Sequence, residues 1–439
     1  YVLAVAGSAV GLGNIWRFPY LAAKYGGGIF LLIYILLTAS FGYVLIMSET
    51  ALGRMTRKSP VGAFGKFGKS KWLSFGGWIN AIIPVLIVPY YSVIGGWVIK
   101  YFWAFMVGDS ALVGATADTS SYFNAFISNA WQPLIFFLIF TAATILVVVF
   151  GVQKGIERVS KILMPLLAIL VVFLAVYALC QPGAMAGLKK LFVPDFEDFR
   201  FETLLAALGQ LFYSMSLAMG IMITYGSYMK KDASISGAAR QISICDTCFA
   251  IVAALIVIPS IFAFSPDPET AAAQSGPSLM FVQLPAVFAE IPGGRWIGAV
   301  FFLLVFFAAL TSSISLVEAI VAVLRENCRL SRRTACIIVF GIMLVLGSLS
   351  SLGFGPLSMI KIGDMDILTI FDYFSNSILM PLVAIGTCII AGFFTDTNGL
   401  MDEIGMRRSW YRRYYRVMIR YVAPLCMAAI MISGIFLDL

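Results

Sequence analysis

An apolar run at the start of the chain is interrupted by Gly7-Ser8-Ala9-Val10-Gly11-Leu12-Gly13-Asn14-Ile15-Trp16-Arg17-Phe18-Pro19, which contains three glycines, an asparagine, an arginine and a proline. In hydrocarbon an unpartnered backbone amide or carbonyl costs several kcal/mol, so irregular backbone persists only against protein or a wet cavity. Glycines make unwinding cheap, and an unwound helix frees carbonyls that can bind a cation. Gly7 and Gly11 also form a GxxxG pattern, which often marks only a close helix contact. Asn14 and Arg17 in the same segment favour a binding-site break.

The composition indicates a polytopic membrane protein. Of 439 residues, 61% are hydrophobic and 12% charged, whereas a soluble domain is about half apolar and a quarter charged. The net charge of +8 comes from Lys and Arg gathered in alternate loops, which indicates topology and no nucleic-acid partner. Seven Cys, mostly within spans, predict no disulfide framework, and the absence of His excludes His-dependent chemistry. No cleavable signal peptide is recognised, and a short polar segment is expected before Tyr1.

The hydrophobic pattern predicts eleven spans: 1–24, 29–53, 74–107, 131–150, 156–180, 203–228, 237–264, 294–326, 333–353, 367–393 and 415–437. The basic loops follow the even-numbered spans. The positive-inside rule therefore predicts a cytoplasmic N-terminus and an extracytoplasmic C-terminus in a plasma (cell inner) membrane. The Arg-rich run 407–420, which also holds a Trp and three Tyr, is expected to be an interfacial anchor on anionic lipid.

A second span carries a similar interruption. Span six reads Gly209-Gln210-Leu211-Phe212-Tyr213-Ser214-Met215-Ser216-Leu217-Ala218-Met219-Gly220, with hydroxyls, an amide and small residues at its middle. Spans one and six are five apart, and halves with an odd number of helices enter a membrane with opposite orientations. Matching interruptions in two halves indicate an inverted-repeat transporter with a midplane site. We predict halves 1–180 and 203–393, with 394–439 as a basic interfacial segment and helix 11.

These residues resemble the first-helix signature of the neurotransmitter:sodium symporters, whose fold is that of the bacterial leucine transporter. The likeness covers nearly the whole chain and extends to Gly26-Gly27-Gly28, Gly53-Arg54, Tyr90-Tyr91 and Ala308-Ala309-Leu310-Thr311-Ser312-Ser313. Eleven spans rather than twelve are typical of the prokaryotic branch. The resemblance implies an all-α membrane protein with a 5+5 inverted repeat, broken helices 1 and 6, and sodium-coupled transport without an organic cofactor.

The resemblance also implies two Na⁺ sites. The first would be formed by Ala9, Asn14, Ser214 and Asp246 together with the substrate carboxylate, and the second by Gly7, Val10, Ala308, Thr311 and Ser312. These positions offer only oxygen atoms, which are the ligands of small hard cations. Asp246 stands where many relatives have an asparagine, and some relatives replace bound chloride with a nearby carboxylate. We hypothesise that Asp246 supplies that anion and makes transport independent of chloride.

The substrate class follows from Gly11, where relatives that carry monoamines have an aspartate. A glycine there leaves room for the carboxylate of a zwitterionic amino acid, held by sodium, by amides at the span-one break and by the Tyr91 hydroxyl. The expected substrates are hydrophobic L-amino acids, both aliphatic and aromatic. The full set of pocket residues that the resemblance implies is Ala9, Gly11, Gly13, Ile87, Tyr91, Ile94, Tyr213, Ser214, Ser216, Ala218, Met219 and Leu316.

The resemblance also implies gates. Arg17 would pair with Asp372 across the external entrance, with Gln210 nearby. On the inside, Glu326 resembles an acid that meets an N-terminal basic residue, which this chain lacks, and Tyr228 would pack there. Gly155 and Pro165 at the start of span five match a family pattern, because Pro removes a helical hydrogen bond and Gly eases unwinding. We hypothesise that this turn opens to hydrate the second sodium site, although an ordinary kink is the alternative.

Other functions are less consistent with the sequence. A same-fold exchanger driven by protons or substrate gradients remains an alternative. An intramembrane enzyme would need a nucleophile with its base, and no such constellation stands out. A channel would need a pore filter, and no repeated carbonyl ring is evident. No phosphate-binding loop matches GxxxxGK[ST], so ion gradients are the expected power source.

Overall fold

The computed structural model describes residues 2–67, 71–114, 117–265, 267–273, 276–363 and 365–436. Tyr1 and Leu437, the outer ends of predicted spans one and eleven, lie outside this range. The chain order of the helices, with π-helical turns labelled η, is α1 (Val2–Ala9), η1 (Gly13–Arg17), α2 (Phe18–Lys24), α3 (Gly28–Leu37), η2 (Thr38–Gly42), α4 (Tyr43–Thr56), α5 (Pro60–Phe67), α6 (Lys71–Val107), α7 (Thr119–Ser128), α8 (Gln132–Val149), η3 (Val152–Glu157), α9 (Arg158–Leu179), α10 (Ala184–Phe192), α11 (Phe201–Ser214), α12 (Ile221–Tyr228), α13 (Ile235–Phe264), α14 (Pro268–Ala272), η4 (Leu279–Gln283), α15 (Leu284–Glu290), α16 (Gly294–Asn327), α17 (Arg332–Leu352), α18 (Ile367–Tyr373), η5 (Phe374–Leu379), α19 (Met380–Ile389), η6 (Ile390–Phe394), α20 (Thr397–Ile404), α21 (Ser409–Val417), η7 (Met418–Val422) and α22 (Ala423–Phe436).

Nine uninterrupted helical segments within the described residues are long and apolar enough to cross a membrane. They are Gly28–Thr56, Ser74–Val107, Gln132–Val149, Val152–Leu179, Ile235–Phe264, Gly294–Asn327, Arg332–Leu352, Ile367–Phe394 and Ser409–Ile435. The remaining two predicted spans, 1–24 and 203–228, are the interrupted ones. Each is divided into pieces shorter than a bilayer crossing, which requires about 20 helical residues.

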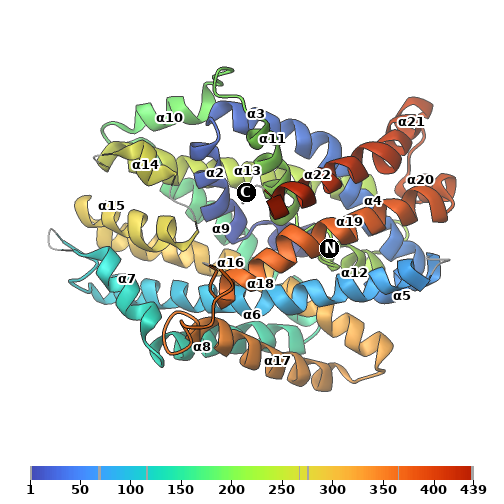
Figure 1. The fold of residues 1–439 in the computed structure, drawn as a ribbon, viewed down its shortest axis with the longest axis horizontal. Coiled ribbons are helices and arrows are strands. Elements are labelled where there is room, and N and C mark those ends of the chain that lie inside the picture. The colour runs from blue at the N-terminus through green and yellow to red at the C-terminus, as the bar shows by residue number, and fades with distance from the viewer. Residues whose placement is uncertain are drawn as a thin grey trace.

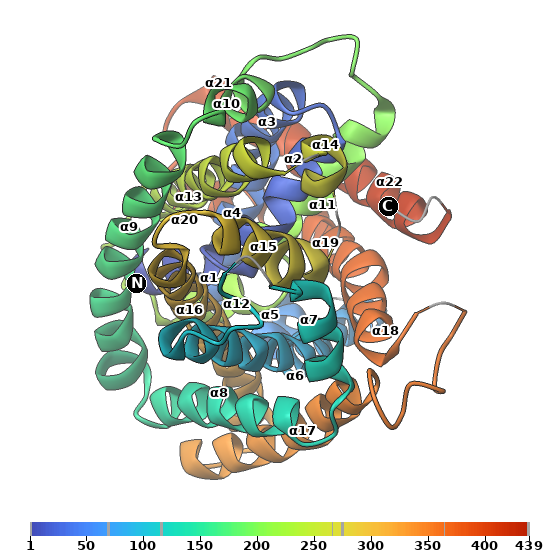
Figure 2. The same cartoon turned by 90° about the vertical axis from the view of Figure 1, so that its left-hand side faces the viewer.

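The long helices run side by side from one end of the molecule to the other (Figure 1). Short helices cap the ends: α5, α20 and α21 at one end, and α7, α10, α14 and α15 at the other. Seen along the helices, α8, α9 and α17 lie at the periphery, while α1 and α12 lie inside (Figure 2). The broken helices are therefore surrounded by protein, which is where irregular backbone is tolerated at membrane depth.

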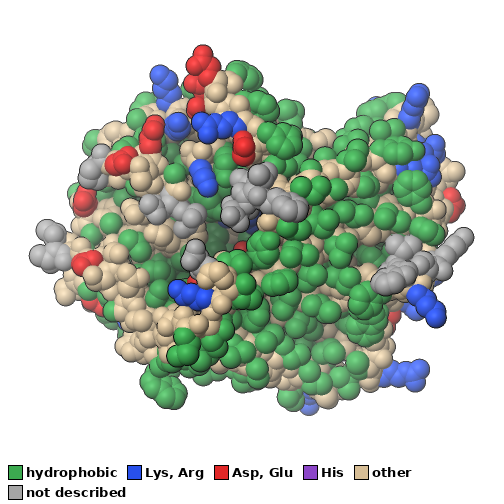
Figure 3. Space-filling view, in the orientation of Figure 1, with side chains coloured by type: hydrophobic (Ala, Val, Ile, Leu, Met, Phe, Trp, Pro, Cys, Tyr) green, Lys and Arg blue, Asp and Glu red, His purple; other side chains and the backbone are tan. Residues whose placement is uncertain are grey.

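Charged side chains gather at the two ends, and a broad hydrophobic band lies between them (Figure 3). Because a hydrocarbon environment penalises exposed charge, this distribution fits a molecule that spans a bilayer with its helices along the membrane normal. The centre of the fold is held by α16, which packs along α6 and against α1. α1 also lies against α13, so the first broken helix has packed helices on several sides.

Candidate ion and substrate site

The first break lies between the end of α1 at Ala9 and the start of η1 at Gly13. The last carbonyls of a helix have no intrahelical donor, so they need other partners. One of them, the Ser8 carbonyl, accepts hydrogen bonds from the Ser312 hydroxyl at 3.0 Å and from the Ser216 hydroxyl at 3.2 Å. This carbonyl therefore ties the first broken helix both to α16 and to the second break. Ser8 was not among the expected site residues, because its role depends on which helices meet there.

The second break separates α11, which ends at Ser214, from α12, which begins at Ile221. Two non-glycine residues in this break adopt left-handed backbone, Ser216 with φ 53° and Ala218 with φ 58°. Such conformations are costly and persist only where the surroundings enforce them. The wholly buried Glu49 of α4 supplies one constraint, because its Oε1 accepts a 3.0 Å hydrogen bond from the Ala218 N–H. The packing around this segment thus holds it in the unwound conformation.

A cavity of about 340 Å³ lies between the two breaks. Glycine keeps it open: a Cβ added at Gly11 would stand 2.5 Å from the Ser312 Oγ and 3.0 Å from the Tyr91 hydroxyl. In the described part of the chain, Ile94 and Ala218 do not line this cavity, although both were expected in the pocket. Ser8 and Leu12 line it and were not expected there. Its lining is Ser8, Ala9, Gly11, Leu12, Gly13, Asn14, Ile87, Tyr91, Tyr213, Ser214, Ser216, Met219, Ser312 and Leu316.

One wall of the cavity combines an unwound backbone amide with a tyrosine. The Leu12 N–H donates to the Tyr91 hydroxyl oxygen at 3.2 Å, and the Gly11 N–H donates to Asn14 Oδ1 at 3.2 Å. These amides, the Tyr91 hydroxyl and the Asn14 amide give this end of the cavity its polar character. The opposite part of the lining holds aliphatic side chains and a methionine, including Ile87, Met219 and Leu316. The cavity therefore has one polar end and one apolar part.

Asn14 and Ser214, two of the residues expected at the first sodium site, contact Asp246, which is completely buried. Asp246 Oδ1 accepts from the Ser214 hydroxyl at 2.5 Å and from the Asn14 amide at 2.9 Å. Oδ2 accepts from the Tyr34 hydroxyl at 2.7 Å. No basic side chain pairs with this carboxylate within the described part of the chain. Sequence reasoning missed Tyr34, because only the packing of α3 against the neighbouring helices reveals its contact with Asp246.

The residues expected at the second sodium site also lie together, between α1 and α16. A Cβ at Gly7 would be 3.4 Å from the Thr311 Cβ, so these two helices approach closely. The Ser312 hydroxyl lies 3.4 Å from the Val10 carbonyl oxygen, and the Thr311 hydroxyl donates to the Ala308 carbonyl at 3.0 Å. Carbonyl and hydroxyl oxygens are thereby concentrated at the first break. Such a donor set suits a small hard cation.

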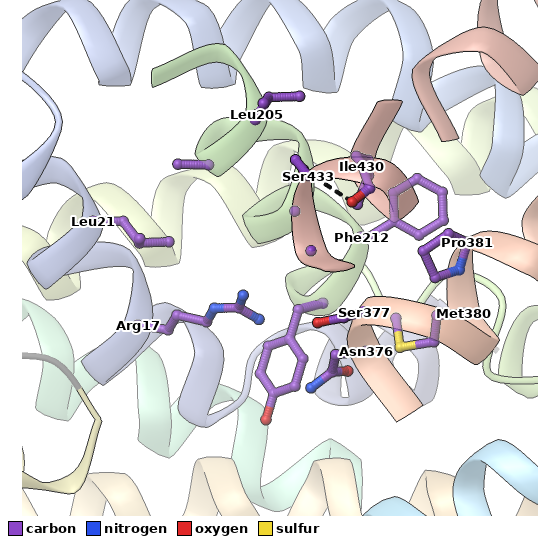
Figure 4. A pocket seen from close by; sticks show the side chains of 14 residues that line it. Arg17, Leu21, Leu205, Phe212, Asn376, Ser377, Met380, Pro381, Ile430 and Ser433 are labelled. Carbon is purple, nitrogen blue, oxygen red and sulfur yellow. Dashed lines mark hydrogen bonds between the residues drawn. The ribbon is translucent and has the colours of Figure 1, made fainter. Parts of the chain in front are cut away.

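A second cavity of about 580 Å³ adjoins the first, and Tyr213 lines both. Arg17 reaches into it opposite Asn376 and Ser377 (Figure 4). Its guanidinium carbon lies 5.1 Å from the centroid of the Tyr213 ring. The Tyr213 side chain is thus shared by the two cavities, and the Arg17 cation lies over its ring.

The expected ion pair between Arg17 and Asp372 is not formed in this structure. Asp372 Oδ1 accepts instead from the Tyr90 hydroxyl at 2.7 Å and from the Asn376 amide at 2.5 Å, while Arg17 lies over the Tyr213 ring. Both of these neutral donors bind the same carboxylate oxygen. The nearby Gln210 donates to the Gly13 carbonyl at 2.9 Å, which braces the first break from α11.

Near the end of α16, Glu326 Oε2 accepts from the Ser59 N–H at 2.5 Å. Tyr228 does not contact Glu326 by hydrogen bond but donates to Glu318 Oε1 at 2.8 Å. The buried Glu318 also forms an ion pair with Arg332, at the start of α17. Sequence reasoning missed Glu318, although an acid within an apolar span is a signal in its own right.

Gly155 lies in η3, and Pro165 lies within α9. A Cβ at Gly155 would stand 2.2 Å from the Val147 carbonyl oxygen, so glycine is required where the start of span five meets the end of α8. The chain is helical on both sides of these residues, with a π-helical turn at Gly155. Opening of this turn stays a prediction.

The chain belongs to the sodium:neurotransmitter symporter family, whose family model matches residues 1–118 and 123–437. It is therefore a sodium-dependent membrane transporter of the leucine-transporter fold and not an enzyme. The crystal structure of MhsT in complex with L-phenylalanine is similar, with a TM-score of 0.89, 36% sequence identity, and coverage of 99% of this chain and 97% of that one. The predicted family membership and fold class are confirmed.

Curated relatives lead to the same family. The sodium-dependent transporter YhdH of Bacillus subtilis is 35% identical and aligns with 99% of this chain and 95% of its own length. A sodium-dependent transporter of Methanocaldococcus jannaschii is 30% identical, over 100% of this chain and 88% of its own. The human sodium- and chloride-dependent taurine transporter is 27% identical, over 99% of this chain and 76% of its own.

Proposed function

We propose that this protein is a Na⁺-coupled symporter of hydrophobic L-amino acids that works by alternating access. The observation that carries the proposal is the cavity between the two breaks, which has amides and a hydroxyl at one end and apolar side chains elsewhere. A zwitterion with an apolar side chain matches this distribution, because its carboxylate and its side chain need opposite environments. MhsT, the similar solved transporter, was crystallised with L-phenylalanine.

The proposed side-chain pocket is broad in its preference. Met219 contributes a flexible thioether, which adapts to side chains of different shape. Gly11 leaves the space that a carboxylate occupies, and any side chain there would meet Ser312 and Tyr91. We therefore expect aliphatic and aromatic amino acids to compete with one another and charged amino acids to bind poorly.

Two sodium ions are proposed as co-substrates. The first ion would bind among Ala9, Asn14, Ser214 and Asp246, where it would offset a buried carboxylate that has only neutral donors. The second would bind among the oxygens at the first break and α16, at Gly7, Val10, Ala308, Thr311 and Ser312. Two charges moved inward with a neutral zwitterion gain roughly 4.6 kcal/mol per 100 mV.

Chloride independence belongs to the same proposal. Asp246 accepts from Tyr34, Ser214 and Asn14, so a fixed negative charge already occupies this donor cluster. A mobile anion would be repelled from it. Relatives such as the human taurine transporter are described as chloride-dependent, so this residue is the proposed point of difference.

The proposed placement is a plasma (cell inner) membrane, with a cytoplasmic N-terminus. At the end that holds α5, α20 and α21 the visible charged side chains are mostly basic, whereas acidic and basic side chains are mixed at the other end, and the positive-inside rule assigns the mostly basic end to the cytoplasm (Figure 3). Within that membrane the proposed halves 1–180 and 203–393 would move against each other around the midplane cavity. Arg17 and Tyr213 would form the outer gate, and Glu326 with the Tyr228–Glu318–Arg332 cluster the inner one.

The experiment is uptake of labelled leucine into proteoliposomes with and without an inward sodium gradient, in potassium gluconate and in chloride. We expect sodium-driven accumulation, competition by phenylalanine, tryptophan and methionine, and no loss in gluconate. Uptake that follows a proton gradient without sodium would instead support the same-fold proton-coupled transporter. Tight binding of glycine or lysine that leucine does not displace would contradict the substrate class.

A further inference from the structure

A lipid-facing groove separates spans two and seven. Its volume is about 810 Å³, and it lies between the α3–η2–α4 helix and α13. Its lining is mostly apolar, and Ile244 is 55% exposed there. The lining residues are Ile35, Thr38, Ala39, Tyr43, Arg240, Ser243, Ile244, Thr247 and Cys248. None of them belongs to the proposed substrate or sodium sites.

Two features of this groove indicate a binding site. The Ser243 and Thr247 hydroxyls are buried and have no hydrogen-bond partner among the described residues. Neither donates to its own helix, although a buried hydroxyl without a partner is costly in an apolar environment. The second feature is Arg240, an exposed cation in the same lining. An occupant with an anionic group and hydrogen-bond acceptors beside an apolar body would satisfy both.

The positions of these groups follow the order of groups in a phospholipid. Arg240 is five residues after the start of α13 at Ile235, near the basic end of the molecule. Ser243 and Thr247 lie deeper along the helix by roughly 4.5 Å and 10 Å, at 1.5 Å per residue. In a phospholipid the phosphate likewise stands above the ester oxygens, and the acyl chains continue below them. Span two contributes the other wall, where the π-helical turn η2 begins at Thr38.

We propose that this groove binds one anionic phospholipid of the cytoplasmic leaflet. Arg240 binds the phosphate, the Ser243 and Thr247 hydroxyls donate to ester oxygens, and an acyl chain lies against Ile35 and Ile244. Charge complementarity selects this occupant, because the cytoplasmic leaflet is anionic and basic pockets between spans bind lipid head groups. The assignment to that leaflet rests on the orientation given with the proposed function.

The groove also adjoins the transport machinery. Ser243 and Thr247 flank Asp246 on α13, and η2 ends at Gly42, where an added Cβ would lie 2.8 Å from the Met215 sulfur in the second break. A lipid bound between spans two and seven would therefore stabilise the helix that carries Asp246 and the helix that packs against the unwound segment. Its expected effect is on the stability of this arrangement and not on substrate contacts.

The test is native mass spectrometry of the purified protein after exchange into phosphatidylglycerol or phosphatidylcholine, followed by graded delipidation. We expect one phosphatidylglycerol to persist on the wild type and phosphatidylcholine to be lost. Arg240→Gln should lower phosphatidylglycerol occupancy about fivefold, the value of one basic residue at a membrane surface. Ile244→Trp should fill the groove and abolish retention.

Matched controls are Arg333→Gln, an exposed cation near the start of α17, and Ile337→Trp, whose side chain is 70% exposed on the same helix. Both should retain the lipid as the wild type does. Equal retention of the two lipids, or full phosphatidylglycerol retention by Ile244→Trp, would overturn the proposal. A thermal melt in detergent verifies that each variant is folded. Because the readout is lipid mass, its outcome is independent of whether sodium drives amino acid uptake.

Discussion

The hydroxyl of Tyr34 donates a 2.7 Å hydrogen bond to Asp246, and the acid is completely buried at the first proposed sodium site. Ser214 and Asn14 complete the donor cluster. Three neutral donors directed at one carboxylate form a site for negative charge, whether that charge belongs to a side chain or to a bound anion such as chloride.

Asp246→Asn should make transport dependent on chloride. The variant keeps the size of the side chain but removes the fixed charge, and charge-assisted hydrogen bonds lost in this way lower uptake about 10- to 100-fold without chloride. Added chloride should restore part of the activity, because Tyr34 and Ser214 would still direct donors at the site. Sodium-driven uptake in gluconate and in chloride measures this. A variant equally active in both solutions would show that the carboxylate does not replace an anion.

Glu49→Ala should destabilise the second break. The carboxylate of Glu49 accepts from the Ala218 N–H, and its loss leaves a buried donor unpaired, at a cost of about 1–3 kcal/mol. Glu49→Gln keeps an acceptor oxygen and should lose less stability. Thermal unfolding in detergent, together with substrate binding, measures both variants. Equal melting of the Ala and Gln variants would contradict a role in holding the unwound segment.

Gly11→Ala should block substrate binding while leaving the fold intact. The new Cβ would stand 2.5 Å from the Ser312 Oγ, in the polar end of the cavity, and overpacking of this kind lowers affinity by at least about tenfold. Scintillation proximity binding of labelled leucine measures the loss. Gly65→Ala is the control, because nothing lies within 4 Å of its added Cβ. Unchanged leucine affinity in Gly11→Ala would place the substrate elsewhere.

Arg332→Gln should weaken the contact between α16, which carries Glu318, and α17, which carries Arg332. Its partner Glu318 is fully buried, and removal of one member of such a pair costs about 3–5 kcal/mol. The Arg332 Nε also donates to the Val148 carbonyl at 2.8 Å, so the α8–α17 contact loosens as well. Thermal unfolding in detergent should show a lower melting temperature. Arg333→Gln, which changes the exposed neighbour, should leave the melting temperature unchanged.

Pro165→Ala should slow sodium release and turnover several-fold. Alanine restores the helical hydrogen bond that proline removes and so stabilises the wound form of span five. Stopped-flow measurement of sodium release after dilution measures the rate. Pro133→Ala is the matched control, because Pro133 stands in the first turn of α8, where its missing N–H costs no helical bond. Equal rates in the wild type and Pro165→Ala would favour an ordinary kink.

The sequence by itself determined the membrane-spanning class, the two broken spans and the family. The segments Gly7 to Pro19 and Gly209 to Gly220 show this by themselves, because small and polar residues within an apolar run indicate irregular backbone, which hydrocarbon tolerates only against protein or a wet cavity. Most residues that line the cavity, including Gly11, Tyr91 and Met219, were expected from the resemblance to the symporter family and not from local pattern alone.

Only the tertiary structure decided which distant side chains meet. The contacts of Asp246 with Tyr34, of Glu49 with Ala218 and of Asp372 with Tyr90 join helices far apart in the chain. No periodicity or spacing encodes such contacts, since each depends on the rotation and depth of two packed helices. The predicted Arg17–Asp372 pair depends on packing in the same way. Here Tyr90 and Asn376 donate to Asp372 Oδ1 and Arg17 lies over the Tyr213 ring, so the pairing of Arg17 with Asp372 across the entrance stays a prediction.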